Sequence, residues 1–142
     1  MNKGIKKIRM NGKDAEHTRS IVRSQILDLI IKKKIMTTLH KAKVLSSVFD
    51  RLVTHAKSGE NSGLNKIKSF FGSNKRSIDR FMQIVKQYMG DRNSGYLRVI
   101  KTSNRVGDNS KMAYVMFSSI KDFSKERKSR ISKVLEKANK SK

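Results

Sequence analysis

The sequence predicts an α+β fold, because helical and strand-forming segments occupy separate parts of the chain. Apolar residues recur at helical spacing over several stretches between residues 17 and 89, and two β-rich runs follow at 96–101 and 113–117. The elements segregate rather than alternate, which is typical of the α+β class. We expect two layers, with one strand and a β-hairpin forming a small three-stranded mixed sheet against the helices.

The chain begins with a basic segment that shows no apolar periodicity. Residues 1–16 mix cations with glycines, which indicates an extended arm that becomes ordered on a partner. The first helix is predicted over 17–34, with Arg19, Arg23 and Lys33 opposite its apolar positions. The run of three lysines at 32–34 is expected to close this helix against the negative end of its dipole.

A short strand and a long helix come next. Residues 35–38 are too short and too β-prone to continue a helix, so they are predicted to form a strand. Thr37 or Thr38 can then N-cap a helix over 39–57, which carries a wide apolar stripe.

Two shorter helices complete the helical part of the chain. They are predicted over 61–71 and 77–89, and Gly90 stands where a C-terminal cap belongs.

The β-rich runs at 96–101 and 113–117 predict a hairpin with an unusually long polar loop. Loops of this length are often functional. The remaining residues, 118–142, carry nine Lys or Arg against three acids and have a weak helical pattern. We therefore expect a basic arm (1–16), one α+β domain (17–117) and a basic C-terminal helical extension (118–142).

Charge is the most informative feature of the composition. The chain has 34 Lys and Arg against 11 Asp and Glu, a formal net charge of +23 over 142 residues. Such a charge favours a polyanionic partner, and phosphate backbones are the usual one. The absence of cysteine excludes disulfides and Cys-based zinc sites and fits a reducing compartment. No apolar run is long enough to span a membrane and no secretory signal is evident, so we expect a cytoplasmic protein.

Residue types that would support catalysis are sparse. His40 and His55 stand on the same predicted helix, roughly 20 Å apart along its axis, so they cannot share a metal. Asp108 lies between a glycine and an asparagine and is interpreted as a turn residue. Glycine-rich phosphate loops are absent. We expect no enzyme, no cofactor and no small-molecule substrate.

Three tyrosines are candidates for stacking on nucleobases. Tyr96 and Tyr114 lie in predicted strands, however, where aromatic residues more often pack in the core or across strands. Tyr88 lies on the last predicted helix of the domain. No aromatic signature of single-strand RNA recognition is present, so shape rather than sequence is the expected target.

Two pairs of segments carry a family resemblance. Residues 35–43 read IMTTLHKAK and residues 52–57 read LVTHAK; residues 95–101 read GYLRVIK and residues 105–114 read RVGDNSKMAY. In their order and spacing, these four segments resemble motifs of the family of the bacterial large-subunit ribosomal protein numbered seventeen. The resemblance extends over about 17–117.

The sequence departs from the family pattern at several places. The arm is rich in Lys, where the family has more Arg and His. Thr18 replaces an Arg that usually follows the helix-start His, and Lys111 replaces a Pro in the loop motif. Contacts of the arm can therefore be inferred by location and charge, not residue by residue.

The resemblance implies a structural component of the large ribosomal subunit that binds its ribosomal RNA near the exit-tunnel side and contacts neighbouring large-subunit proteins. Arginines are favoured contacts because the guanidinium binds phosphate bidentately. Thr37 and Thr38 are candidates either for hydroxyl contacts with RNA or for helix capping. The candidate RNA-binding residues are Lys3, Lys6, Lys7, Arg9, Lys13, His17, Arg19, Arg23, Lys32, Lys33, Lys34, Thr37, Thr38, Lys41, Lys43, Arg98, Lys101, Arg105 and Lys111.

A nuclease would need clustered carboxylates or His that the chain lacks, and the apolar face of the C-terminal helix is sparse for binding an anionic membrane. The main alternative on the residues alone is a general nucleic-acid-binding protein. A basic protein of this size could coat DNA or RNA without a ribosomal address, since electrostatic contacts with phosphates need no particular sequence.

Overall fold

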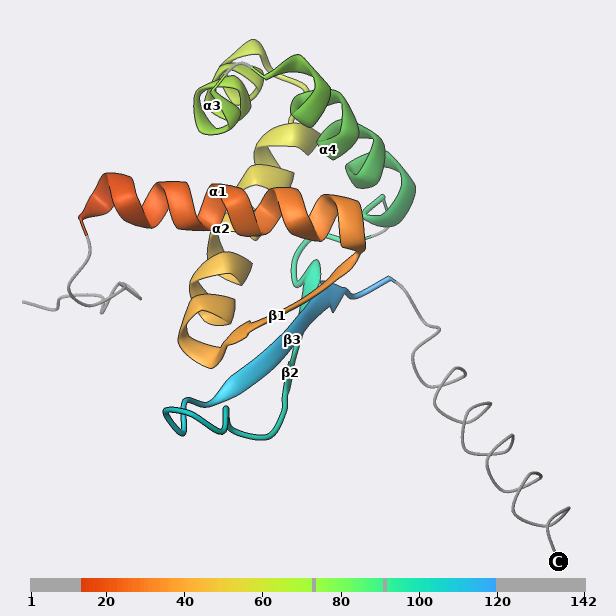
Figure 1. Ribbon diagram of the computed structural model, residues 1–142. Coiled ribbons are helices and arrows are strands. Elements are labelled where there is room, and N and C mark those ends of the chain that lie inside the picture. The colour runs from red at the N-terminus through yellow and green to blue at the C-terminus, as the bar shows by residue number, and fades with distance from the viewer. Residues whose placement is uncertain (1–13, 73, 91, 120–142) are drawn as a thin grey trace, which may run out of the picture.

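A computed structural model describes residues 14–72, 74–90 and 92–119, and these form four helices and three strands (Figure 1). The α+β prediction is confirmed. The predicted C-terminal helix and most of the arm lie outside the described residues. The elements in chain order are α1 (Ala15–Lys32), β1 (Lys34–Thr38), α2 (Leu39–Lys57), α3 (Asn61–Phe71), α4 (Lys75–Tyr88), β2 (Leu97–Lys101) and β3 (Met112–Phe117).

The three strands form an antiparallel sheet in the order β1-β3-β2. The expectation of a mixed sheet was wrong. β1 and β2 do run in the same direction, but β3 lies between them and is antiparallel to both. Tyr114 at the centre of the sheet is opposite Met36 of β1 and Ile100 of β2. The hairpin thus inserts its second strand beside β1, so no parallel pair forms.

The core lies between the helices and one face of the sheet, and α2 runs through it. Figure 1 shows α2 crossing behind α1, with α3 and α4 grouped near the C-terminal end of α2. Phe49 of α2 is fully buried, and its ring centroid lies 5.9 Å from those of both Phe81 (α4) and Phe117 (β3). This aromatic cluster joins α2, α4 and the central strand.

The end of α1 differs from its prediction because of one residue. Lys33 adopts a left-handed conformation (φ 60°), and its N–H donates to the Leu29 carbonyl at 2.8 Å. This cap satisfies a carbonyl of the last turn and redirects the chain into β1. The lysine run 32–34 therefore does not close the helix as predicted, because Lys34 already belongs to the strand.

The N-cap residues of α2 and α4 differ in whether their side chains make a capping hydrogen bond. Asn74 N-caps α4, where its Oδ1 accepts a hydrogen bond from the Ser77 N–H at 3.3 Å, so the helix begins two residues before the predicted 77. Thr38 occupies the N-cap position of α2 as predicted, but its side chain makes no capping hydrogen bond. α2 and α3 otherwise have the bounds expected from the sequence.

Within the described ranges, no helix has both the length and the apolar character needed to cross a bilayer.

Candidate nucleic-acid interface

The candidate cations lie on several faces of the body rather than in one cleft. The arm residues Lys3, Lys6, Lys7, Arg9 and Lys13 lie outside the described residues. Most of the others are exposed on α1, α2 and the hairpin, as the charge pattern leads one to expect. The exposed candidates are His17, Arg19, Lys32, Lys33, Lys43, Arg98, Lys101, Arg105 and Lys111, and Arg23, Lys34, Thr38 and Lys41 are half-buried.

Thr37 is the exception, and its assignment as an RNA contact needs correction. The residue is 8% exposed, and its hydroxyl accepts a hydrogen bond from Gln25 Nε2 at 2.9 Å. It points to the helix-covered side of the sheet, opposite Ala113, which is fully buried. Its burial between β1 and α1 makes it a structural residue, and it is not available to a macromolecular partner on the surface.

The face of the sheet turned away from the described helices, here called the uncovered face, brings together two predicted cations that are distant in sequence. Lys34 of β1 and Arg98 of β2 both stand opposite Met116 of β3. In the next row, Met36 and Ile100 flank Tyr114 and are 56% and 41% exposed. This face therefore combines positive charge with exposed apolar surface.

The three tyrosines have different environments. Tyr114 lies on the uncovered face, with the Lys34 ammonium 4.1 Å from its ring centroid. Tyr96 is buried and donates its hydroxyl to the Arg92 carbonyl at 3.0 Å, so it belongs to the core. Tyr88 stacks on Phe117 at 5.9 Å, and its hydroxyl accepts from Lys33 Nζ at 3.1 Å. Only Tyr114 among them combines a strand position with an outward ring.

The long hairpin loop is held by its own hydrogen bonds. Arg105 and Asp108 form a bidentate ion pair, in which Nε donates to Oδ1 at 2.8 Å and Nη2 donates to Oδ2. Asp108 also accepts from the Ser110 N–H at 3.2 Å and from its hydroxyl at 2.7 Å. The interpretation of Asp108 as a turn residue is confirmed. Arg105 is engaged in the same turn through this ion pair.

We expect Asp108→Asn to loosen this loop without unfolding the domain. Hydrogen bonds from Arg105, and then from Ser110, hold the pKa of Asp108 below its ordinary value. A lowered folded pKa means that the carboxylate stabilises the loop above the ordinary Asp value, about 4, and that this contribution is lost as the pH falls toward the folded pKa. Amide exchange of Ser110 and Asn109 at pH 7 should be faster in the variant.

The matched control for the loop is Asp79→Asn, which removes an exposed carboxylate from α4. Loop exchange should be unchanged in the control. Equal exchange rates in Asp108→Asn and the wild type would contradict the role of the ion pair in ordering the loop.

Arg23 occupies a partly enclosed position between α1 and α3. Its guanidinium carbon lies 5.9 Å from the Phe70 ring centroid, and a Cβ added at Gly72 would lie 3.8 Å from its Nη1. The Nε atom is buried and has no hydrogen-bond partner in the described part of the chain. Arg23 thus places a positive charge beside the end of α3.

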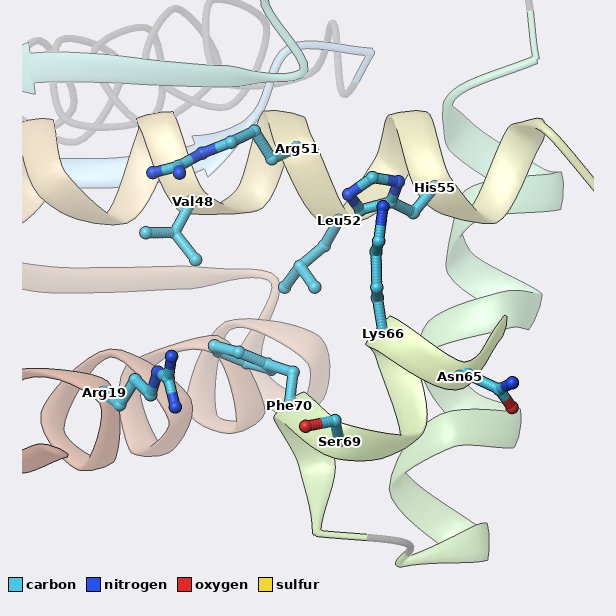
Figure 2. Close-up of a pocket in the computed structure, with 9 residues that line it drawn as sticks. All are labelled: Arg19, Val48, Arg51, Leu52, His55, Asn65, Lys66, Ser69 and Phe70. Carbon is cyan, nitrogen blue, oxygen red and sulfur yellow. The ribbon is translucent and has the colours of Figure 1, made fainter. Parts of the chain in front are cut away.

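A cavity of about 610 Å³ opens beside this region, between α1, α2 and α3 (Figure 2). Arg19 from α1, Arg51 and His55 from α2, and Lys66 from α3 line it. Only Arg19 was a candidate from the sequence. The other three come from different turns and helices, and no local spacing in the sequence brings them together.

Taken together, the fold and its surface define a small, strongly basic α+β protein. Among the described residues, no group of three or more His, Asp or Glu side chains is placed to hold a metal ion. The family model "Ribosomal protein L17" matches residues 21–118, which is nearly the whole described body. The chain belongs to the ribosomal protein L17 family.

Individual relatives support the same assignment. The chain is 34% identical over 106 residues to large ribosomal subunit protein bL17m of Dictyostelium discoideum, a match that covers 75% of this chain and 58% of that protein. It is 28% identical over 104 residues to bL17 of Koribacter versatilis, covering 73% and 64%. It is 36% identical over 108 residues to bL17 of Mesomycoplasma hyopneumoniae strain 7448, covering 72% and 89%. The matches to the first two therefore span less than two thirds of those proteins.

Proposed function

We propose that this protein is a structural component of the large ribosomal subunit in the cytoplasm, where it binds ribosomal RNA and neighbouring large-subunit proteins and has no enzymatic role. The observation that carries the proposal is the family match over residues 21–118, which coincides with the folded body. The net charge of +23 supports RNA as the main partner. The resemblance noted in the sequence adds a position near the exit-tunnel side.

Contacts are proposed on the uncovered sheet face, the exposed side of α1 and the hairpin loop. Arg98 is the strongest single candidate, since its guanidinium is exposed on β2 and can bind a phosphate with two hydrogen bonds. Lys101 and Lys111 extend the positive charge along the hairpin. The arm, including Lys6 and Arg9, would add contacts deeper in folded RNA. Contacts of this kind fix position and orientation rather than read bases.

Binding to large-subunit ribosomal RNA should depend steeply on salt. If about six to ten phosphates are neutralised, affinity should fall by about 10³- to 10⁵-fold between 50 and 200 mM salt. Arg98→Gln should reduce the slope of log affinity against log salt by about 1. Filter binding of the full chain to the RNA over a salt series measures both quantities.

Lys86→Gln is the charge-matched comparison, because it removes an exposed cation from α4, away from the proposed contacts. A salt dependence close to zero would refute electrostatic binding. Binding to RNA does not by itself establish a ribosomal location, so the tagged protein should also co-sediment with the large subunit after a high-salt wash. Release from the subunit, with equal affinity for unrelated DNA and RNA, would favour a general nucleic-acid-coating protein instead.

A further inference from the structure

We propose that the cavity between α1, α2 and α3 is a binding site for one unpaired nucleotide of RNA, which places its base on the apolar floor and its phosphate on the cationic rim. The inference rests on the proposed function, because it assumes RNA as the partner. It names a specific site that lies apart from the uncovered sheet face and the hairpin loop.

The floor of the cavity is apolar and contains the aromatic ring of Phe70, which packs against a neighbouring ring. Val48 and Leu52 come from α2, and Phe70 comes from the last turn of α3 (Figure 2). The Phe70 ring packs edge-on against Phe71 at a centroid distance of 5.2 Å, and Phe71 is buried in the core. Phe70 is itself only partly buried, so it offers an aromatic surface at a fixed position. Nucleobases stack on such surfaces irrespective of their identity.

Each of the three helices contributes at least one cationic side chain to the rim of the cavity. Figure 2 shows Arg19 on α1, Arg51 and His55 on α2, and Lys66 on α3 around the opening, and no carboxylate is among the lining residues. Arg51 is oriented by its own helix, because its Nε donates to the Ser47 carbonyl at 3.2 Å, while the rest of its guanidinium carries further N–H donors. Side chains from three helices thus place several donors around one opening.

The charge of this site limits what can occupy it. Arg23 adds a further cation next to Phe70, with its guanidinium carbon over the ring at 5.9 Å from the centroid, and so increases the positive charge beside the floor. The terminal segments of the chain, 1–16 and 118–142, are themselves strongly basic and would be repelled. An anion with a flat apolar part fits both the floor and the rim. An unpaired nucleotide is such a group, and folded RNA presents unpaired nucleotides in its loops and bulges.

The size of the cavity is consistent with this occupant. A volume of about 610 Å³ falls within the range of about 300–1,000 Å³ that is typical of sites for small ligands. Asn65 and Ser69 of α3 also line it and can hydrogen-bond to base edges or to the ribose. These amide and hydroxyl groups accept and donate, so they favour no particular base.

The test compares a decauridine RNA with an abasic decamer that has the same number of phosphates. The full-length wild type should bind decauridine about tenfold more tightly than the abasic decamer, because only the former can stack a base. Phe70→Leu should remove most of this difference and leave the salt dependence unchanged. Phe70→Tyr, which keeps an aromatic ring, should retain it and guards against an effect of misfolding.

The rim is tested separately with Arg51→Gln and Lys66→Gln. Both should weaken binding of both decamers, whereas Lys86→Gln on α4 should leave the affinity for each decamer close to that of the wild type. Amide NMR signals of Asn65 and Ser69 should shift on addition of decauridine. A wild type without preference for the base-bearing decamer, or a preference that persists in Phe70→Leu, overturns the proposal.

A decaglutamate peptide distinguishes a nucleotide site from a site for an acidic protein. If the peptide shifts the same signals and competes with decauridine, with equal affinity for Phe70→Leu and wild type, the cavity belongs to an acidic protein partner and the proposal is overturned. Loss of the base preference in Phe70→Leu with intact binding to ribosomal RNA supports the site. If ribosomal RNA binds with the expected salt dependence but no base preference is found, only the nucleotide site fails and the proposed function stands.

Discussion

Phe49→Ala is expected to lower the free energy of unfolding by about 3–5 kcal/mol, the usual cost of truncating a buried Phe. Phe49 is fully buried on α2, and its ring lies 5.9 Å from those of Phe81 and Phe117. The substitution leaves a cavity where two helices and the central strand meet. Domains have total stabilities of about 5–15 kcal/mol, so the variant should be close to unfolding at 37 °C.

Urea denaturation followed by circular dichroism measures this loss. Ile31→Ala is the matched control, because Ile31 is exposed on α1 and its truncation should change stability by no more than about 0.5 kcal/mol. Equal stabilities of the two variants would show that the aromatic cluster does not hold the helical layer to the sheet.

Gly63→Ala should destabilise the protein by about 1–3 kcal/mol, although alanine normally favours a helix. Gly63 lies buried near the start of α3, against the end of α2. An added Cβ would stand 2.5 Å from the His55 carbonyl oxygen and 2.9 Å from Ser58 Oγ. The oxygen belongs to the backbone, so relief of the clash requires α2 and α3 to move apart.

The comparison for this prediction is Gly90→Ala, since a Cβ at Gly90 meets no atom within 4 Å. Thermal unfolding of both variants should show a lower midpoint for Gly63→Ala alone. An unchanged or raised midpoint in Gly63→Ala would mean that the α2–α3 contact yields at little cost. Because α2 and α3 both line the proposed nucleotide cavity, moving them apart in Gly63→Ala should change the shape of that cavity as well as lower the stability.

Local patterns in the sequence located all four described helices, but they did not fix every helix end or the contacts between helices. α2 and α3 have their predicted bounds because each combines a clear apolar stripe with a distinct end. The end of α1 could not be predicted, since Lys33 is a non-glycine residue in a left-handed conformation. The strand order also escaped prediction, because the alternation of apolar residues along β3 does not specify which partner lies on either side.

The sequence predicted only some of the residues of the candidate site, for a similar reason. Charge identified the exposed cations, among them Arg98 and Lys111, but whether any of them contacts RNA stays a prediction. Burial of Thr37 depends on Gln25, twelve residues earlier on α1, and has no local signal in the sequence. The rim residues Arg51 and Lys66 stand together only because α3 folds back along α2.

The position of β3 has a consequence for synthesis of the protein. The central strand is the last element of the described body, and it supplies every hydrogen-bonded partner of both β1 and β2. A nascent chain that has not reached Met112 can form helices, but it has no sheet, and its two edge strands remain without partners. Such long-range pairing is slow to form and leaves exposed strand edges open to aggregation. Completion of the sheet is therefore expected to be a late event in synthesis of the chain.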